Sequence, residues 1–90
     1  MKLYYLTATC VDLSGQHKNP EILHSYASAN TEEDAVTQFA AYLLNTLLIS
    51  GSTFESIKLE NNVLTLTKTG TLLEDKSITV QVTFTVDKVI

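Results

Sequence analysis

The stretch TEEDAVTQFAAYLLNTLLISG, residues 31–51, decides the fold, because its apolar residues repeat with the period of a helix. Thr31 suits the N-cap position, since its hydroxyl can accept a hydrogen bond from an N–H group of the first turn. The acidic residues that follow lie where the helix dipole is positive, and Gly51 can adopt the left-handed conformation that ends a helix. We therefore predict a helix whose buried face carries Val36, Phe39, Ala40, Leu43 and Leu47.

Segments that alternate apolar and polar residues surround this helix, and each of them predicts a strand. They comprise residues 2–12 and 21–29 before the helix, and residues 54–60, 63–68 and 77–88 after it. The first two should form a long hairpin, whose side-chain facing predicts these pairs: Tyr4 with Ala29, Leu6 with Ala27, Ala8 with Ser25, and Cys10 with Leu23.

Asn61 and Asn62 predict a tight turn between the third and fourth strands, because asparagine tolerates positive φ. This turn would place the apolar residues of the two strands on one face, namely Ile57 and Leu59 with Leu64 and Leu66.

The predicted fold class is α+β, in a single domain that covers residues 1–90, with the element order β-β-α-β-β-β. One helix would cover one face of a single five-stranded antiparallel sheet. The spatial strand orders 2-1-5-4-3 and 2-1-3-4-5 both make every neighbour antiparallel. We prefer the first order, because residues 77–88 alternate most cleanly in the chain, which is typical of a strand inside a sheet.

The composition bears on partners and compartment. Six lysines, no arginine and a net charge of −4 leave the chain without the guanidinium groups that bind nucleic acid. No apolar run approaches the roughly 18 residues of a membrane span, and the alternating amino terminus is unlike a signal peptide. Cys10, the only cysteine, excludes an internal disulfide and fits a reducing compartment. We expect a cytoplasmic protein with no nucleic-acid or membrane partner.

Residues that could carry chemistry are few and scattered. Cys10 and His24 could form a nucleophile and its base, but the predicted hairpin places them on opposite faces, so Cys10 is expected to be a core thiol. His17 has no second metal ligand nearby in sequence, and the helix dipole explains the acidic residues 32–34. No glycine-rich phosphate loop or nucleophile motif is present. We therefore expect no enzymatic activity, no cofactor and no metal site.

The face of the sheet opposite the helix is the first candidate contact surface. It should be polar yet nearly uncharged, with these residues: Tyr5, Thr7, Thr9, His24, Tyr26, Lys58, Thr65, Thr67, Thr79, Gln81, Thr83 and Thr85. Among them Tyr5, Tyr26, Thr83 and Thr85 are the candidate interface residues. The alternative is that threonine is frequent there only because of its high β propensity.

A strip on the helix is the second candidate. Leu44 lies at the edge of the buried face, and Ala41 and Leu48 lie outside it. Either the sheet curls to cover this strip, or the strip meets another chain, in which case a homodimer or a partner-bound helix is expected.

These features favour a small non-catalytic binding protein that acts through protein–protein contact. Small, acidic, single-domain chains are also carried by phages and other mobile elements as inhibitors of a host complex, anti-CRISPR proteins among them, although this is an analogy of size and composition. The alternative function is a small-molecule-binding module with a pocket between helix and sheet.

Overall fold

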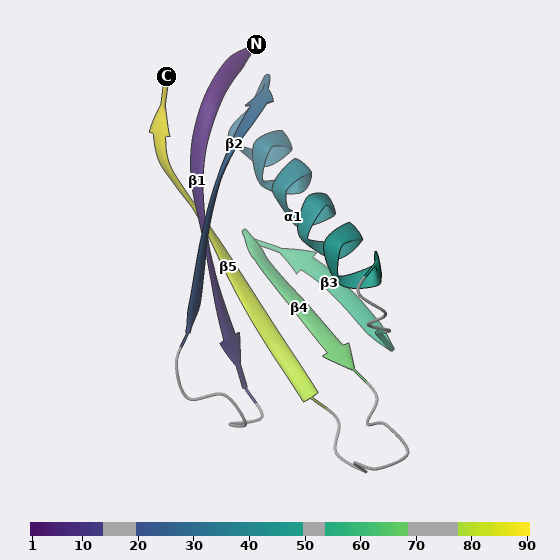
Figure 1. Ribbon diagram of the computed structural model, residues 1–90. Coiled ribbons are helices and arrows are strands. Elements are labelled where there is room, and N and C mark those ends of the chain that lie inside the picture. Colours follow the sequence, from purple (N-terminus) through teal and green to yellow (C-terminus); the bar gives the residue numbers. More distant parts are fainter. Residues whose placement is uncertain (14–19, 50–53, 69–77) are drawn as a thin grey trace.

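The computed structural model describes residues 1–13, 20–49, 54–68 and 78–90, and within them the chain forms one sheet and one helix (Figure 1). The elements in chain order are β1 (Lys2–Asp12), β2 (Glu21–Ala29), α1 (Glu32–Ile49), β3 (Ser56–Glu60), β4 (Val63–Lys68) and β5 (Ile78–Val89). The five-stranded sheet has the order β2-β1-β5-β4-β3, and every neighbouring pair is antiparallel. The predicted fold class, element order and preferred strand order are confirmed. Gly51, the predicted helix stop, lies outside the described residues.

β5 lies inside the sheet, between β1 and β4 (Figure 1). Val82 and Phe84 are buried on the face toward α1, whereas Thr83 and Thr85 are exposed on the opposite face. A strand with neighbours on both edges satisfies its backbone N–H and C=O groups along its length. The clean alternation of this segment therefore matches its interior position, as the sequence predicts.

The β1–β2 hairpin has the predicted facing, but its register is shifted by two residues. Tyr4 lies opposite Ala27, Leu6 opposite Ser25, Ala8 opposite Leu23, and Cys10 opposite Glu21, so the predicted pairs are wrong. Side chains alternate between the two faces with a period of two, and a shift of two residues keeps each of them on its face. The alternation therefore could not distinguish the two registers.

α1 begins as predicted, with Thr31 as its N-cap. Thr31 Oγ1 accepts a hydrogen bond from the Asp34 backbone N–H at 3.1 Å. The buried face carries the predicted Val36, Phe39 and Ala40, together with Ala35, which the prediction omitted. Leu43 is half-buried against the same core, and the side chain of Leu47 lies outside the described part. No helix in the described ranges is both long and apolar enough to cross a membrane.

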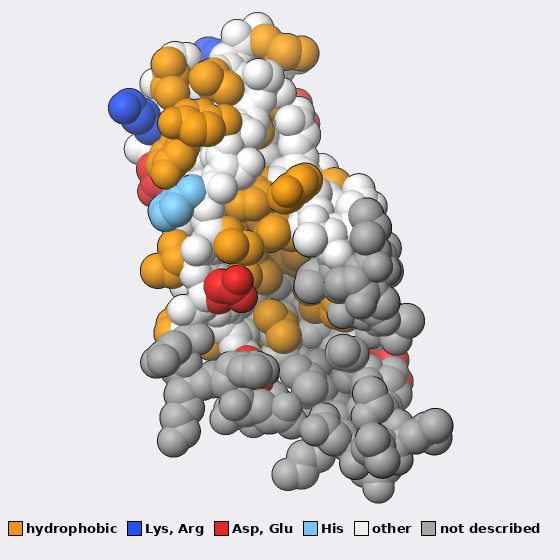
Figure 2. All heavy atoms as spheres, in the orientation of Figure 1, with side chains coloured by type: hydrophobic (Ala, Val, Ile, Leu, Met, Phe, Trp, Pro, Cys, Tyr) orange, Lys and Arg blue, Asp and Glu red, His pale blue; other side chains and the backbone are white. Residues whose placement is uncertain are grey.

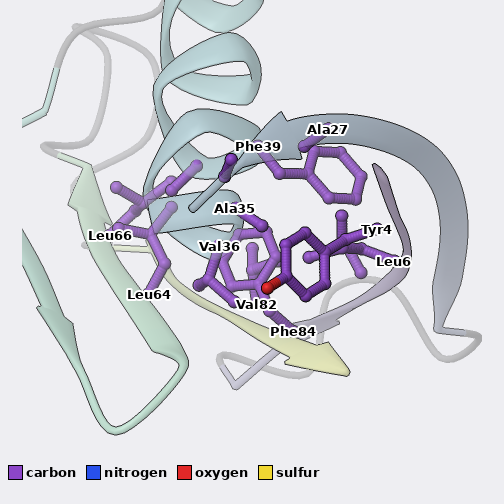
Figure 3. Close-up of a cluster of buried hydrophobic side chains, with 13 residues drawn as sticks. Tyr4, Leu6, Ala27, Ala35, Val36, Phe39, Leu64, Leu66, Val82 and Phe84 are labelled. Carbon is purple, nitrogen blue, oxygen red and sulfur yellow. The ribbon is translucent and has the colours of Figure 1, made fainter. Parts of the chain in front are cut away.

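The core lies between α1 and the facing side of the sheet (Figure 3). Phe39 of α1 meets Phe84 of β5 edge to face, with 5.4 Å between ring centroids and 63° between ring planes. The small residues Ala27 and Ala29 are buried on β2, where they let the helix approach the strand closely. Leu64 and Leu66 of β4 complete the core on the far side of β5.

β3 forms one edge of the sheet, and α1 does not cover it. Ile57 lies opposite Leu66 and Leu59 opposite Leu64, as predicted, so these side chains share a face. The two β4 leucines are buried, yet Ile57 and Leu59 are 51% and 40% exposed. α1 packs instead on β2, β1 and β5, which leaves the apolar side of β3 open.

The predicted tight turn joins β3 to β4. Asn61 and Asn62 have φ values of 52° and 63°, in the left-handed region that asparagine tolerates. This conformation at both central residues is that of a type I′ hairpin turn, and it fixes the pairing of Glu60 with Val63.

Candidate functional site

The face of the sheet turned away from α1 is the candidate site. Cross-strand pairing aligns its side chains in rows, with Tyr5 between Tyr26 and Lys88, and Thr7 between His24 and Thr85. Figure 2 shows hydrophobic side chains gathered at the end of the molecule where the two termini lie, with lysine, acidic and histidine side chains beside them. No element among the described ranges packs on this face.

The centre of the site is a cluster of three rings, which we call the aromatic cluster: Tyr5, His24 and Tyr26. The Tyr5 and His24 rings stack, with centroids 5.6 Å apart and planes 8° from parallel. The Tyr5 and Tyr26 rings are tilted by 54°, with centroids 4.8 Å apart. Tyr5 is half-buried between its neighbours, whereas Tyr26 is 60% exposed. Tyr5 thus supports the two outer rings, and Tyr26 presents apolar area to the solvent.

Thr7 ties this cluster to β5. Its hydroxyl lies 3.1 Å from His24 Nδ1 and donates a hydrogen bond to Asp87 Oδ2. A hydroxyl has a single proton, and here Asp87 accepts it, so the proton of the other hydrogen bond must come from His24 Nδ1. The stacked imidazole is therefore held in one orientation, with its Nδ1–H group donating to the Thr7 oxygen.

A β-bulge lies at Asp87, which is on the outer face two residues after Thr85. The β1–β5 register shifts between Tyr5, which pairs with Lys88, and Leu6, which pairs with Val86. Asp87 is the extra residue between them, and its carboxylate reaches Thr7 on the outer face. Bulges re-aim side chains, and this one places Lys88 opposite Tyr5 on the outer face, where strict alternation would have turned it to the inner face.

The set Thr7, His24 and Asp87 has the residue types of a hydrolase triad, but its geometry differs. In a triad the histidine accepts the proton of the hydroxyl nucleophile, and the carboxylate holds the histidine. Here the Asp87 carboxylate accepts the proton of the Thr7 hydroxyl, and His24 donates a hydrogen bond to the same hydroxyl oxygen. The network therefore positions the rings and leaves the Thr7 oxygen without an accepting imidazole.

The structure places the predicted contact residues in two groups. Tyr5 and Tyr26 lie together in the aromatic cluster, and Thr83 and Thr85 are exposed on β5, opposite Thr9 and Thr7. On α1, Ala41 is exposed, Leu44 is half-buried against the core, and the side chain of Leu48 lies outside the described residues.

The outer face carries more charge than the sequence analysis predicted. Lys58 and Glu60 of β3 form an exposed ion pair at 3.0 Å, while Asp87 and Lys88 border the aromatic cluster. The central threonines are uncharged, as expected, but the margins are not. Strict alternation places Asp87 on this face beside Thr85, but the predicted list of face residues did not include it, and alternation gave no signal for the bulge that adds Lys88.

Cys10 and His24 do not form a pair, as predicted from their opposite faces. Cys10 is half-buried and packs against the core, whereas His24 is exposed on the other face. Burial raises the pKa of the Cys10 thiol, and the negative charge of Glu21, its partner across the hairpin, raises this pKa further.

Cys10 should therefore react slowly in the folded protein. An aromatic disulfide reagent is expected to label it more slowly in the native state than after denaturation, because the raised pKa leaves less thiolate at a given pH. The pH at which native labelling reaches half its maximal rate should lie above that of the unfolded chain. The chain has a single cysteine, so the signal is unambiguous. Equal native and denatured rates would contradict the facing of β1.

A groove lies between the first turns of α1 and the β3–β4 turn. Its volume is about 680 Å³, and these residues line it: Glu32, Glu33, Val36, Thr37, Leu59, Glu60, Asn61 and Asn62. Small-molecule sites are mostly apolar with a few convergent polar groups, whereas this lining is mostly acidic and polar. Among the described residues no group of three or more His, Cys, Asp or Glu side chains is arranged to hold a metal ion.

A comparison of the chain with protein-family models, curated proteins and solved structures finds no significant match.

Proposed function

We propose that the protein is a non-catalytic binding module that contacts another protein through the outer face of its sheet, with the aromatic cluster at the centre of the contact. The observation that carries this proposal is the exposure of Tyr26, at 60%, against the Tyr5 ring, which in turn stacks on the hydrogen-bonded imidazole of His24. Tyrosine is enriched among the residues that dominate binding energy at protein interfaces.

The order of the cluster in the unbound chain supports this role. A tyrosine ring supplies a large contact area at a small cost in conformational entropy, because few torsions have to be fixed on binding. Tyr5 and His24 already hold their ring planes 8° from parallel. The partner would therefore meet a preformed surface and lose little affinity to ordering it.

The charges around the cluster suit the margin of an interface. Asp87 and Lys88 have opposite signs and flank the apolar rings, as in interfaces that have an apolar centre and a polar rim. A partner protein that fits this surface would expose an apolar patch flanked by charged groups of both signs. Within this class, a cytoplasmic inhibitor of a larger host complex, of the kind that phages and mobile elements carry, suits a small acidic chain.

Substitution of Tyr26 tests the proposal. Tyr26→Ala is expected to weaken binding of the partner by about 30-fold or more, the effect of an interface residue worth about 2 kcal/mol, and to leave thermal stability nearly unchanged. Tyr42→Ala is the matched control, because Tyr42 is 64% exposed on α1, in the other layer of the molecule.

The partner would be captured from host cells with the wild-type chain, purified, and titrated calorimetrically against both variants. Loss of affinity with Tyr42→Ala and not with Tyr26→Ala would move the contact to the helix and refute the proposed surface. Absence of any stoichiometric protein partner would refute the proposed function itself.

The small-molecule alternative has one observation in its favour. The groove of about 680 Å³ beside α1 falls within the usual size range of ligand pockets. Its lining includes Glu32, Glu33 and Glu60, so only a polar or cationic ligand would suit it. The exposed aromatic cluster favours the protein partner.

A further inference from the structure

We propose that the open edge of β3 pairs with β3 of a second copy of this chain, antiparallel, around a two-fold axis at Lys58. This contact goes beyond the proposed function and does not depend on it, because it uses the edge of the sheet and not its outer face.

The backbone groups of Ile57 and Leu59 point away from the sheet. Glu60 and Val63 flank the tight turn, so they form a hydrogen-bonded pair, and alternate residues of β3 then bond to β4. Ile57 and Leu59 fall between these residues, and their N–H and C=O groups face the open side. Among the described residues, no group bonds to β3 from that side.

The opposite edge of the sheet is partly occupied by a contact from α1. Gln38 of α1 donates a hydrogen bond from Nε2 to the Ser28 carbonyl oxygen of β2 at 2.9 Å. This contact occupies a backbone acceptor that another strand would need. Among the described residues, no comparable contact occupies the outward backbone groups of Ile57 and Leu59 on β3.

The exposed side chains of β3 favour a second copy as the occupant. Residues directly opposite each other in an antiparallel pair point to the same face. With the axis at Lys58, Ile57 lies opposite Leu59 of the second copy, and Leu59 opposite its Ile57. These aliphatic side chains, 51% and 40% exposed in the single chain, would cover one another on the side of the sheet that carries α1.

The charges of β3 complement their own reversed copy along the diagonals of the proposed strand pair. Lys58 and Glu60 lie on the outer face, 3.0 Å apart. In the proposed register the two lysines meet at the axis, and each also lies diagonally across from Glu60 of the other copy, within reach of a long side chain. The two diagonal contacts between Lys58 and Glu60 would offset the repulsion between the two lysines that face each other at the axis.

An axis at Leu59 is the rival register, and the turn argues against it. That register would place Lys58 directly opposite Glu60, but it would also place Ile57 opposite Asn61. Asn61 has a φ of 52°, so it is not extended and cannot continue a ladder. The axis at Lys58 uses the outward backbone groups of both Ile57 and Leu59.

The pairing has a consequence for binding. Because edge-to-edge antiparallel pairing keeps faces together, both helices would lie on one side of a continuous sheet, and both aromatic clusters on the other. A dimer would then present two copies of the cluster to one partner assembly, and linked sites gain apparent affinity without new contacts.

Sedimentation equilibrium over a concentration series reaching the millimolar range tests the contact. The wild-type chain is expected to show a monomer–dimer equilibrium, and Ile57→Lys should raise the dimer dissociation constant about tenfold or more. Ile22→Lys, at an aliphatic residue 58% exposed on β2, is the matched control and should leave the constant unchanged. Circular dichroism would verify that both variants are folded.

Disulfide trapping tests the register. With Cys10→Ser as background, Lys58→Cys should form a covalent dimer on mild oxidation, because only the residue on the axis meets itself across a close, non-hydrogen-bonded pair. Leu59→Cys and Glu60→Cys should remain mainly monomeric. A wild-type chain that is monomeric throughout, or a dimer that Ile57→Lys leaves intact, overturns the proposal. If the natural occupant of this edge is a strand from a different protein, the wild-type chain alone would be monomeric throughout, and the proposal would be overturned.

Discussion

Phe39→Ala is expected to lower the free energy of unfolding by about 3–5 kcal/mol, a large part of the stability of a small domain. Phe39 is 3% exposed and is the helix residue whose ring packs edge to face on Phe84, so its removal leaves a cavity between the two layers. Urea denaturation monitored by circular dichroism would measure the change.

Tyr42→Ala is the control for this substitution, since Tyr42 is an aromatic residue of the same helix that is 64% exposed. It should change the free energy of unfolding by no more than about 0.5 kcal/mol, as surface substitutions usually do. A loss below about 1 kcal/mol for Phe39→Ala would show that the helix packs through another face.

Leu64→Ala is expected to cost about 2–5 kcal/mol, whereas Leu59→Ala should cost about 1 kcal/mol or less. The two leucines are directly opposite each other on the same face of the β3–β4 hairpin, so they differ mainly in burial. Leu64 is 1% exposed beneath α1, and Leu59 is 40% exposed beyond it. The same denaturation experiment would compare them at low protein concentration. Equal losses would mean that β3 is covered as fully as β4.

The fold could be predicted well because facing and element type follow from local patterns. The alternation of residues 77–88 indicated an interior strand, and the N-cap and acidic first turn located the start of α1. The coverage of the sheet could not be predicted in the same way. A single helix is too narrow to cover all five strands, and the sequence period does not show which strands it covers. Whether Ile57 and Leu59 lie under the helix therefore depends on tertiary packing.

The aromatic cluster shows how far the site could be predicted. Alternation placed Tyr5 and Tyr26 on one face, but the predicted hairpin register would have put Ser28 opposite Tyr5. The actual register pairs Tyr5 with Tyr26, and the two rings meet only because of that shift of two residues. The bulge at Asp87 is a second departure that alternation cannot reveal, since it inserts a residue into the period.

The interior position of β5 has a consequence for how the chain folds. β5 is the last strand in the sequence, yet it is the strand that joins β1 to β4. Until β5 is in place, no strand pairing connects the β1–β2 hairpin to the β3–β4 hairpin. Tyr4 pairs with Val89 near the opposite end of the chain, which means that a long loop has to close before this pairing gains any free energy. An isolated hairpin is marginal in water. We therefore expect the sheet to form late and all at once, with slow refolding limited by the insertion of β5.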